Sequence, residues 1–272
     1  MIIRPVAHLR VMRGGAQAHL VRADDGHSYV VKFLNNPQHR RILANEWLGT
    51  KIAAAVGLSV PEVAVMDVGP EFIAQNSMLA IRTFAHTVPC CPGPALASRL
   101  PVDEPEIPIS DYLPDAALET VENLPEFAGI LALDKWLCNC DGRQAVFFRP
   151  KAHGPYRACF IDFGFCFSAG DWDFPDSPLR GVYPGNLVYR DVTGWESFEP
   201  WLSRIEAFPE AVLHEIASGM SRKWAPKRKR VLRLLEEILA RRARVRELVR
   251  QVHLRSRAPF RNWHGDSLAI SA

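Results

Sequence analysis

Short apolar runs separated by turn-forming residues dominate the first third of the chain, and this pattern predicts a small β-rich unit. The pair Asp25-Gly26 is typical of a hairpin turn between two of the runs. One stretch differs, because its apolar positions from Leu43 to Val56 recur at helical spacing along one face, and Gly57 ends it. Strands are predicted at residues 6–9, 18–21, 28–33, 63–66 and 77–81.

The chain changes character after a passage rich in proline. Six prolines between residues 89 and 108 argue against a continuous element, so this passage is predicted to be a crossing and a loop. Apolar spacing then predicts helices at 124–137, 198–216 and 228–252, and a strand at 156–161. We therefore predict an α+β fold with two lobes, a small β-rich N-lobe of residues 1–86 and a mostly helical C-lobe of residues 87–272.

Composition narrows the class of protein. Hydrophobic residues make up 48% and charged residues 23% of the 272 positions, as in a soluble globular protein. No apolar run reaches the roughly 18 residues that a membrane span requires, and the N-terminus lacks the apolar core of a signal peptide. The six cysteines form no Cys-x-x-Cys pair, so we expect reduced, mostly buried thiols, no zinc site and a cytoplasmic protein.

Charge is distributed unevenly. Residues 222–257 contain fourteen Lys or Arg and three Glu, a net charge of +11, which leaves −8 for the remainder. Apolar positions from Val231 to Val252 follow helical spacing on one side. Two interpretations are open: a helix packed on the C-lobe with a solvated basic face, which we favour, or a docking site for a polyanion or a protein partner.

Candidate residues for phosphoryl transfer follow one another in a fixed order along the chain. A triphosphate requires backbone N–H groups, a fixed cation and metal ions. Glycines allow close approach of the backbone, a strand lysine held by a helix glutamate supplies the cation, and two carboxylates remain for metal binding and for orienting a hydroxyl. These residues are Gly14, Gly15, Lys32, Glu46, Asp141 and Asp162.

The motifs around these positions resemble those of HipA-like kinases, which have a protein-kinase-like, phosphoinositide-kinase-like fold. The resemblance covers roughly residues 13–205, most of the chain. It rests on Val31-Lys32-Phe33, Asn45-Glu46, Gly57-Leu58-Ser59-Val60-Pro61-Glu62, Asn139-Cys140-Asp141-Gly142-Arg143 and Asp162-Phe163-Gly164.

The resemblance implies ATP and Mg²⁺ as cofactors and assigns a role to each residue. Lys32 is expected to hold phosphates, Glu46 to pair with it, Asp141 to be the catalytic base and Asp162 to bind magnesium. The family pattern has an Asn five places after the catalytic Asp, where this chain has Val146. Gln144 is the nearest amide and is the candidate second magnesium ligand.

Two functions follow from this pattern. The first is a kinase that transfers the γ-phosphoryl group of ATP to a hydroxyl, on a protein Ser or Thr or on a small molecule. The second is a nucleotide-binding pseudokinase, motivated by the shortened loop after Asp141. A third possibility, a nucleic-acid-binding protein, has only the basic helix behind it and no base-reading motif.

Overall fold

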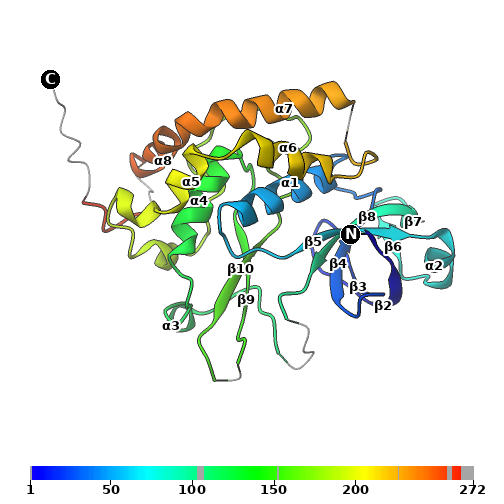
Figure 1. Ribbon diagram of the computed structural model, residues 1–272. Helices are drawn as coiled ribbons and strands as arrows, with labels where there is room; N and C mark the ends of the chain where they lie inside the picture. The colour runs from blue at the N-terminus through cyan, green and yellow to red at the C-terminus, as the bar shows by residue number, and fades with distance from the viewer. Residues whose placement is uncertain (1, 103–106, 152, 226, 256–258, 265–272) are drawn as a thin grey trace.

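The computed structural model describes every residue except 1, 103–106, 152, 226, 256–258 and 265–272 (Figure 1). A curled sheet with the order β1-β5-β8-β4-β3-β2 forms the N-terminal part, and a group of helices packs beside it. Only β1 and β5 run parallel in this sheet. Its strands are β1 (Ile2–Ile3), β2 (Pro5–Val11), β3 (His19–Ala23), β4 (Ser28–Lys32), β5 (Val63–Val68) and β8 (Gly93–Arg99).

Strand β8 corrects the prediction for the proline-rich passage. Residues 93–99 are not a loop but a strand between β4 and β5, where Leu96 pairs with both Lys32 and Val65. Pro94 lies near the start of the strand, which leaves the small apolar residues after it free to complete the ladder. The predicted boundary between residues 86 and 87 would separate β8 from its sheet.

A hairpin and a short helix extend this part of the molecule. Helix α2 (Pro70–Gln75) follows β5, and β6 (Ala80–Arg82) pairs antiparallel with β7 (Thr87–Pro89). Under the sheet lies a small apolar core of its own, to which Val31, Phe33, Met66 and Ala97 belong.

Helix α1 (Ile42–Ala55) lies between the sheet and the helical part. It is buried on nearly all sides, including the polar residues Asn45, Glu46 and Thr50, so the predicted one-sided helix is wrong. The helix contacts β5 and β8 of the sheet and also α6 of the helical part. A helix that lies between two layers has no free side, so its polar residues must find partners within the protein.

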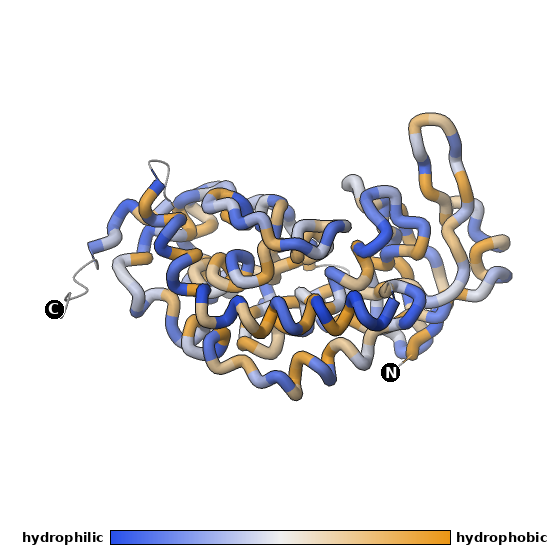
Figure 2. The backbone as a smooth tube through the Cα atoms, turned by 90° about the horizontal axis from the view of Figure 1, so that it is seen from above, coloured by the Kyte–Doolittle hydropathy of each residue, from blue (hydrophilic) through white to orange (hydrophobic). Residues whose placement is uncertain are grey.

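The C-terminal part is helical around a second, larger apolar core. A predicted single helix at 198–216 is two helices separated at Pro209, and the predicted helix at 228–252 is α7 and α8 separated by a 3-10 turn (Arg242–Arg244). Figure 2 shows hydrophilic and hydrophobic residues alternating along α7, whose first turn is hydrophilic. The helices are α3 (Asp115–Leu118), α4 (Glu126–Trp136), α5 (Trp201–Glu206), α6 (Glu210–Ser218), α7 (Arg228–Arg241) and α8 (Val245–His253), with 3-10 turns at Asn186–Tyr189 and Trp195–Phe198.

One hairpin brings the middle of the chain toward the sheet. Strand β9 (Gln144–Phe148) pairs antiparallel with β10 (Arg157–Ile161), and the register places Gln144 opposite Ile161. The residues immediately before β9 and immediately after β10 therefore lie at the same end of the hairpin. The two candidate carboxylates from the sequence, Asp141 before β9 and Asp162 after β10, belong to these two segments.

Candidate active site

Lys32 joins the two parts of the molecule through its ammonium group. Its Nζ lies 2.8 Å from Oε2 of Glu46 on α1 and 3.1 Å from Oδ1 of Asp162, which follows β10. Burial alone would lower the pKa of Lys32, but the two carboxylates outweigh it and hold the pKa above its ordinary value. The lysine is therefore a permanent cation at the meeting point of strand, helix and hairpin.

Asp162 carries a negative charge and an unusual backbone conformation. Burial would raise the pKa of its carboxyl, but Lys32 above all, with Arg143 and Gln144, lowers the pKa below the ordinary value. Its φ of +63° lies in the left-handed region, which a non-glycine residue occupies at an energetic cost. A conformation of this kind turns the chain sharply after β10.

Glu46 fixes the segment after Asp162 as well as the lysine. Its Oε1 accepts a hydrogen bond from the backbone N–H of Phe163 at 3.1 Å, while Oε2 receives Lys32. The next residue, Gly164, lies against α1 so closely that a Cβ there would be 2.5 Å from Cγ1 of Ile42. Glycine is required at this position because the segment packs directly on the helix.

Gln144 reaches Asp162 from the other strand of the hairpin. Its Nε2 donates to Oδ2 of Asp162 at 3.1 Å, and Gln144 itself is exposed. The sequence predicted Gln144 as a replacement for the absent Asn, and the register of β9 on β10 places its amide beside the carboxylate. Lys32, Glu46, Asp162 and Gln144 thus form one continuous network.

Asp141 lies on the loop between α4 and β9 and is exposed. Its backbone N–H donates to Oδ1 of Asn139 at 3.1 Å, and its carboxylate accepts from the N–H of Gly142 at 2.8 Å. Its carbonyl also accepts from the N–H of Gly181 at 2.8 Å. The loop is therefore held by side-chain oxygens of Asn139 and Asp141 and by the backbone of Gly181, and no described ion pair involves the Asp141 carboxylate.

A buried ion pair supports this loop from below. Arg143 donates to both carboxylate oxygens of Asp134, its Nη1 donates to the carbonyl of Ile161 at 2.6 Å, and its guanidinium stacks on the ring of Phe163 at 4.3 Å. Arg143 therefore binds an acid within the protein. Asn139 also donates to Asp134, so it both closes a turn and anchors the loop.

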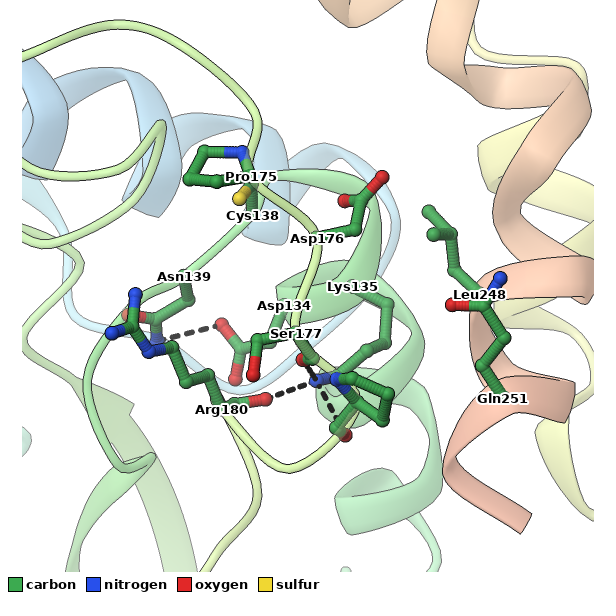
Figure 3. A pocket seen from close by; sticks show the side chains of 11 residues that line it. Asp134, Lys135, Cys138, Asn139, Pro175, Asp176, Ser177, Arg180, Leu248 and Gln251 are labelled. Carbon is green, nitrogen blue, oxygen red and sulfur yellow. Dashed lines mark hydrogen bonds between the residues drawn. The ribbon is translucent and has the colours of Figure 1, made fainter. Parts of the chain in front are cut away.

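Lys135, next to Asp134 on α4, holds the segment that covers the Asp141 loop. Its ammonium points at backbone carbonyls of Ser177, Pro178 and Arg180 (Figure 3). Burial lowers the pKa of Lys135 to about 8. Gly181 in the same segment donates to the carbonyl of Asp141. Lys135 therefore helps to position Asp141 indirectly, through this segment.

The glycine turn lies between β2 and β3 and is exposed at Gly14 and Gly15. Gly14 has a φ of +110°, which L side chains rarely adopt. The side chain of Gln17 exchanges hydrogen bonds with the backbone of Arg82, and Asn36 donates to the carbonyl of Ala16. The described hydrogen bonds do not connect the glycines to Lys32.

Two residues that organise the site had no predicted role. Asn45, fully buried on α1, donates through Nδ2 to the carbonyls of Gly164, Cys166 and Ala169 at 2.8 to 2.9 Å. Nε2 of His39 lies 2.9 Å from the Gly164 carbonyl, while its Nδ1 accepts from the N–H of Arg41. Asn45 belongs to the Asn-Glu motif, and this motif was the only feature of the sequence that pointed to either residue.

Much of the basic charge near the C-terminus is used inside the protein. Arg241 is buried, pairs with Asp176 and donates to the carbonyls of Lys135 and Trp136 at the end of α4. Arg244 also pairs with Asp176, and Arg246 pairs with two glutamates. Exposed basic side chains nevertheless remain in the first half of α7, at Arg228, Lys229, Arg230 and Arg233, and on α8 at Arg250.

A scan against protein families matches a model described as HipA-like kinase over residues 6–145. This match covers about half of the chain and includes Lys32, Glu46 and Asp141. The chain belongs to the HipA-like kinase family. Its enzymatic class is that of a phosphotransferase, as the sequence predicted. No curated protein matches the chain.

Solved structures of kinases share the fold of this HipA-like kinase. Golgi casein kinase with Mn/ADP bound gives a TM-score of 0.56 at 14% identity, covering 93% of this chain and 74% of that one. The Helicobacter pylori proinflammatory kinase CtkA gives 0.55 at 16% identity, with 90% and 96% covered. Hydra Fam20 with sugar gives 0.55 at 10% identity, with 98% and 90% covered. The predicted α+β, protein-kinase-like fold is confirmed.

In the described part of the chain, no helix is long and apolar enough to cross a membrane. The same residues contain no group of three or more His, Cys, Asp or Glu side chains arranged to hold a metal ion. All six cysteines are unpaired, and Cys90, Cys138, Cys159 and Cys166 are buried. The sequence predicted mostly buried thiols, and four of the six are buried.

Proposed function

We propose that this HipA-like kinase transfers the γ-phosphoryl group of ATP to a hydroxyl group, with a protein Ser or Thr as the acceptor and Mg²⁺ as the metal. The observation that carries the proposal is the position of the Lys32 ammonium between Glu46 and Asp162. A cation fixed by a helix carboxylate, beside a second carboxylate on the other part of the molecule, is the arrangement that phosphoryl transfer requires.

The residues divide into those that bind phosphate and those that act on the acceptor. Lys32 binds the phosphates, Glu46 holds Lys32, and the backbone of Gly14 and Gly15 covers the nucleotide. Asp141 orients the acceptor hydroxyl and accepts its proton. Asp141 is exposed, and among the described residues its carboxylate accepts one hydrogen bond, from Gly142. Both features support this role, because the other oxygen can meet a hydroxyl.

The donor set at Asp162 fits a hard divalent cation. Asp162 is anionic, and Nε2 of Gln144 donates to the same carboxylate, so a half-turn of this amide would present its oxygen to a cation held by Asp162. Carboxylate and amide oxygens are ligands that Mg²⁺ accepts alongside water and phosphate oxygens, so a cluster of three acidic side chains is not needed. When bound, the metal would neutralise charge on the phosphates. The ADP and Mn found with Golgi casein kinase support a nucleotide and a divalent cation here.

Two further assignments belong to this proposal. We place the boundary between the lobes after Arg99, because β8 completes the N-terminal sheet. We also place the protein in the cytoplasm, which its six unpaired cysteines support, since thiols persist in reducing compartments.

The test is phosphoryl transfer from ATP labelled at the γ-position. Purified protein with Mg²⁺ should label itself, or an acceptor in a protein fraction, and Asp162→Ala should not. Asp173→Ala is the matched control, because Asp173 is an exposed acid in the same segment. Calorimetric titration of ATP with Mg²⁺ into the same proteins measures binding separately. Equal nucleotide affinity and equal labelling in wild type and Asp162→Ala would contradict the assignment.

A further inference from the structure

A basic cavity lies where α1 and α7 begin, apart from the Lys32 network. Its volume is about 560 Å³, and Trp224 and Ala225 form its apolar wall. Among the residues that the structure describes, no acidic side chain lines it. Its remaining lining residues are all cations: Arg40, Arg41, Lys223, Lys227 and Arg230.

Arg41 is the unusual member of this group. It is only 2% exposed, yet its Nε and Nη1 have no hydrogen-bond partner within the described part of the chain. Its guanidinium stacks on the ring of Trp172 at 4.6 Å, which satisfies a face of the group but none of its N–H donors. Buried donors without acceptors are rare in proteins, so an acceptor from outside the chain is the natural partner.

The two helices add to the positive potential of the cavity. Arg41 occupies the N-cap position of α1, and Lys227 occupies the N-cap position of α7. As described, neither helix has an acidic residue in its first turn or a side-chain cap. Helix N-termini favour anions, and here two of them open on the same cluster of cations.

We propose that this cavity binds a phosphate monoester, carried by a phosphorylated residue of a protein or by a small phosphate compound. A monoester near neutral pH carries close to two negative charges and three acceptor oxygens, which matches a concave site with one buried guanidinium and cations at its rim. A nucleotide base finds no platform there, because Trp224 is buried and donates to the carbonyl of Pro94.

The cavity is connected to the candidate active site by direct contacts. Arg41 stacks on Trp172, and Nε1 of Trp172 donates to Oδ1 of Asn45 at 2.7 Å. Asn45 in turn holds the carbonyls of Gly164, Cys166 and Ala169. A phosphate that fixes Arg41 should therefore stabilise the segment that follows Asp162.

Calorimetry with inorganic phosphate and with phosphoserine, at low ionic strength, tests the binding. We expect the wild type to bind both, and Lys227→Ala combined with Arg230→Ala to weaken binding about a hundredfold, since each lost charge-assisted contact is worth roughly a factor of ten. Lys227 and Arg230 are exposed, so the fold should survive. Arg41→Met should abolish binding. Arg233→Ala, also exposed on α7 but outside the cavity, should change nothing.

Three further measurements distinguish binding in this cavity from binding at the nucleotide site and from general attraction of anions. Lys32→Ala should bind phosphate like the wild type, which separates the cavity from the proposed nucleotide site, where Lys32 would be the phosphate ligand. Hydrogen exchange in residues 163–172 should slow when phosphoserine is added to wild type, and not in the double variant. A phosphoserine peptide that binds more tightly than inorganic phosphate would identify a protein source. No binding by wild type, an equal loss in Arg233→Ala, or tighter binding of an oligonucleotide than of phosphoserine would overturn the proposal.

Discussion

Arg143 and Asp134 form an ion pair in which neither side chain is exposed to solvent. The same guanidinium donates to the carbonyl of Ile161, the residue immediately before Asp162. The pair therefore fixes the end of β10, directly before Asp162, the residue that we propose as the metal ligand. Removal of either charge would leave the other buried without a partner, which is more costly than burial of the intact pair.

Arg143→Met should lower the free energy of unfolding by about 3 to 5 kcal/mol, because it leaves the Asp134 carboxylate buried and unpaired. Urea unfolding followed by circular dichroism measures the change. Arg157→Met is the control, since Arg157 makes an exposed pair with Glu122 at 3.9 Å, and it should cost less than about 1 kcal/mol. Similar losses in the two variants would show that Arg143 contributes only packing.

Lys32→Ala and Glu46→Ala should each reduce kcat/KM, and the double variant should lose little more than either single variant. The two groups act as one unit, because Glu46 works mainly by holding Lys32 at 2.8 Å. A double-mutant cycle on the labelling rate measures the coupling. The exposed pair Arg190 and Glu119 provides a control in which all three variants should keep wild-type rates. Strictly additive losses would assign Glu46 a role independent of the lysine.

The sequence was sufficient to predict the group of Lys32, Glu46 and Asp162, because each lies at a recognisable place in a strand, a helix or a turn. It was also sufficient for most elements, since apolar periodicity is a local property. Strand β8 was missed because proline signals a break, although Pro94 lies near the start of the strand, where a missing N–H is tolerated.

The partners of buried polar residues could not be predicted for a different reason. Asn45 bonds to carbonyls more than a hundred residues away, and Arg41 stacks on Trp172. Helical spacing shows which face of a helix is apolar, but not that a second layer will cover the polar face. For this reason the prediction that α1 buries only one face was wrong, and no structural role was predicted for Asn45.

The free energy of unfolding should fall as the pH falls from about 6.5 to about 4. Burial, assisted by the neighbouring His8, lowers the pKa of His19 from 6.5 to about 4. Within this window the unfolded chain binds a proton that the folded chain does not, so acid favours unfolding. His19→Gln should flatten this dependence in urea titrations at several pH values, leaving the smaller contributions of His8 and His39, whose pKa values burial also lowers.

The exposed His86, on the connection between β6 and β7, provides the control for this experiment. His86→Gln should keep the pH dependence of the wild type. An unchanged dependence in His19→Gln would show that other groups govern the acid sensitivity.

Asp141 should be dispensable for binding ATP and required for transfer. A carboxylate that positions a hydroxyl acts mainly in the transition state, so Asp141→Asn should lower kcat by about a hundred- to ten-thousand-fold with little change in ATP affinity. The substitution keeps an oxygen that can accept from Gly142, so the loop should hold its shape. Labelling kinetics and calorimetry measure the two quantities, with Asp173→Asn as the exposed control. A wild type that binds ATP tightly yet labels neither proteins nor small hydroxyl compounds would show that the protein is a pseudokinase. Gln144 beside Asp162 would then support nucleotide binding without phosphoryl transfer.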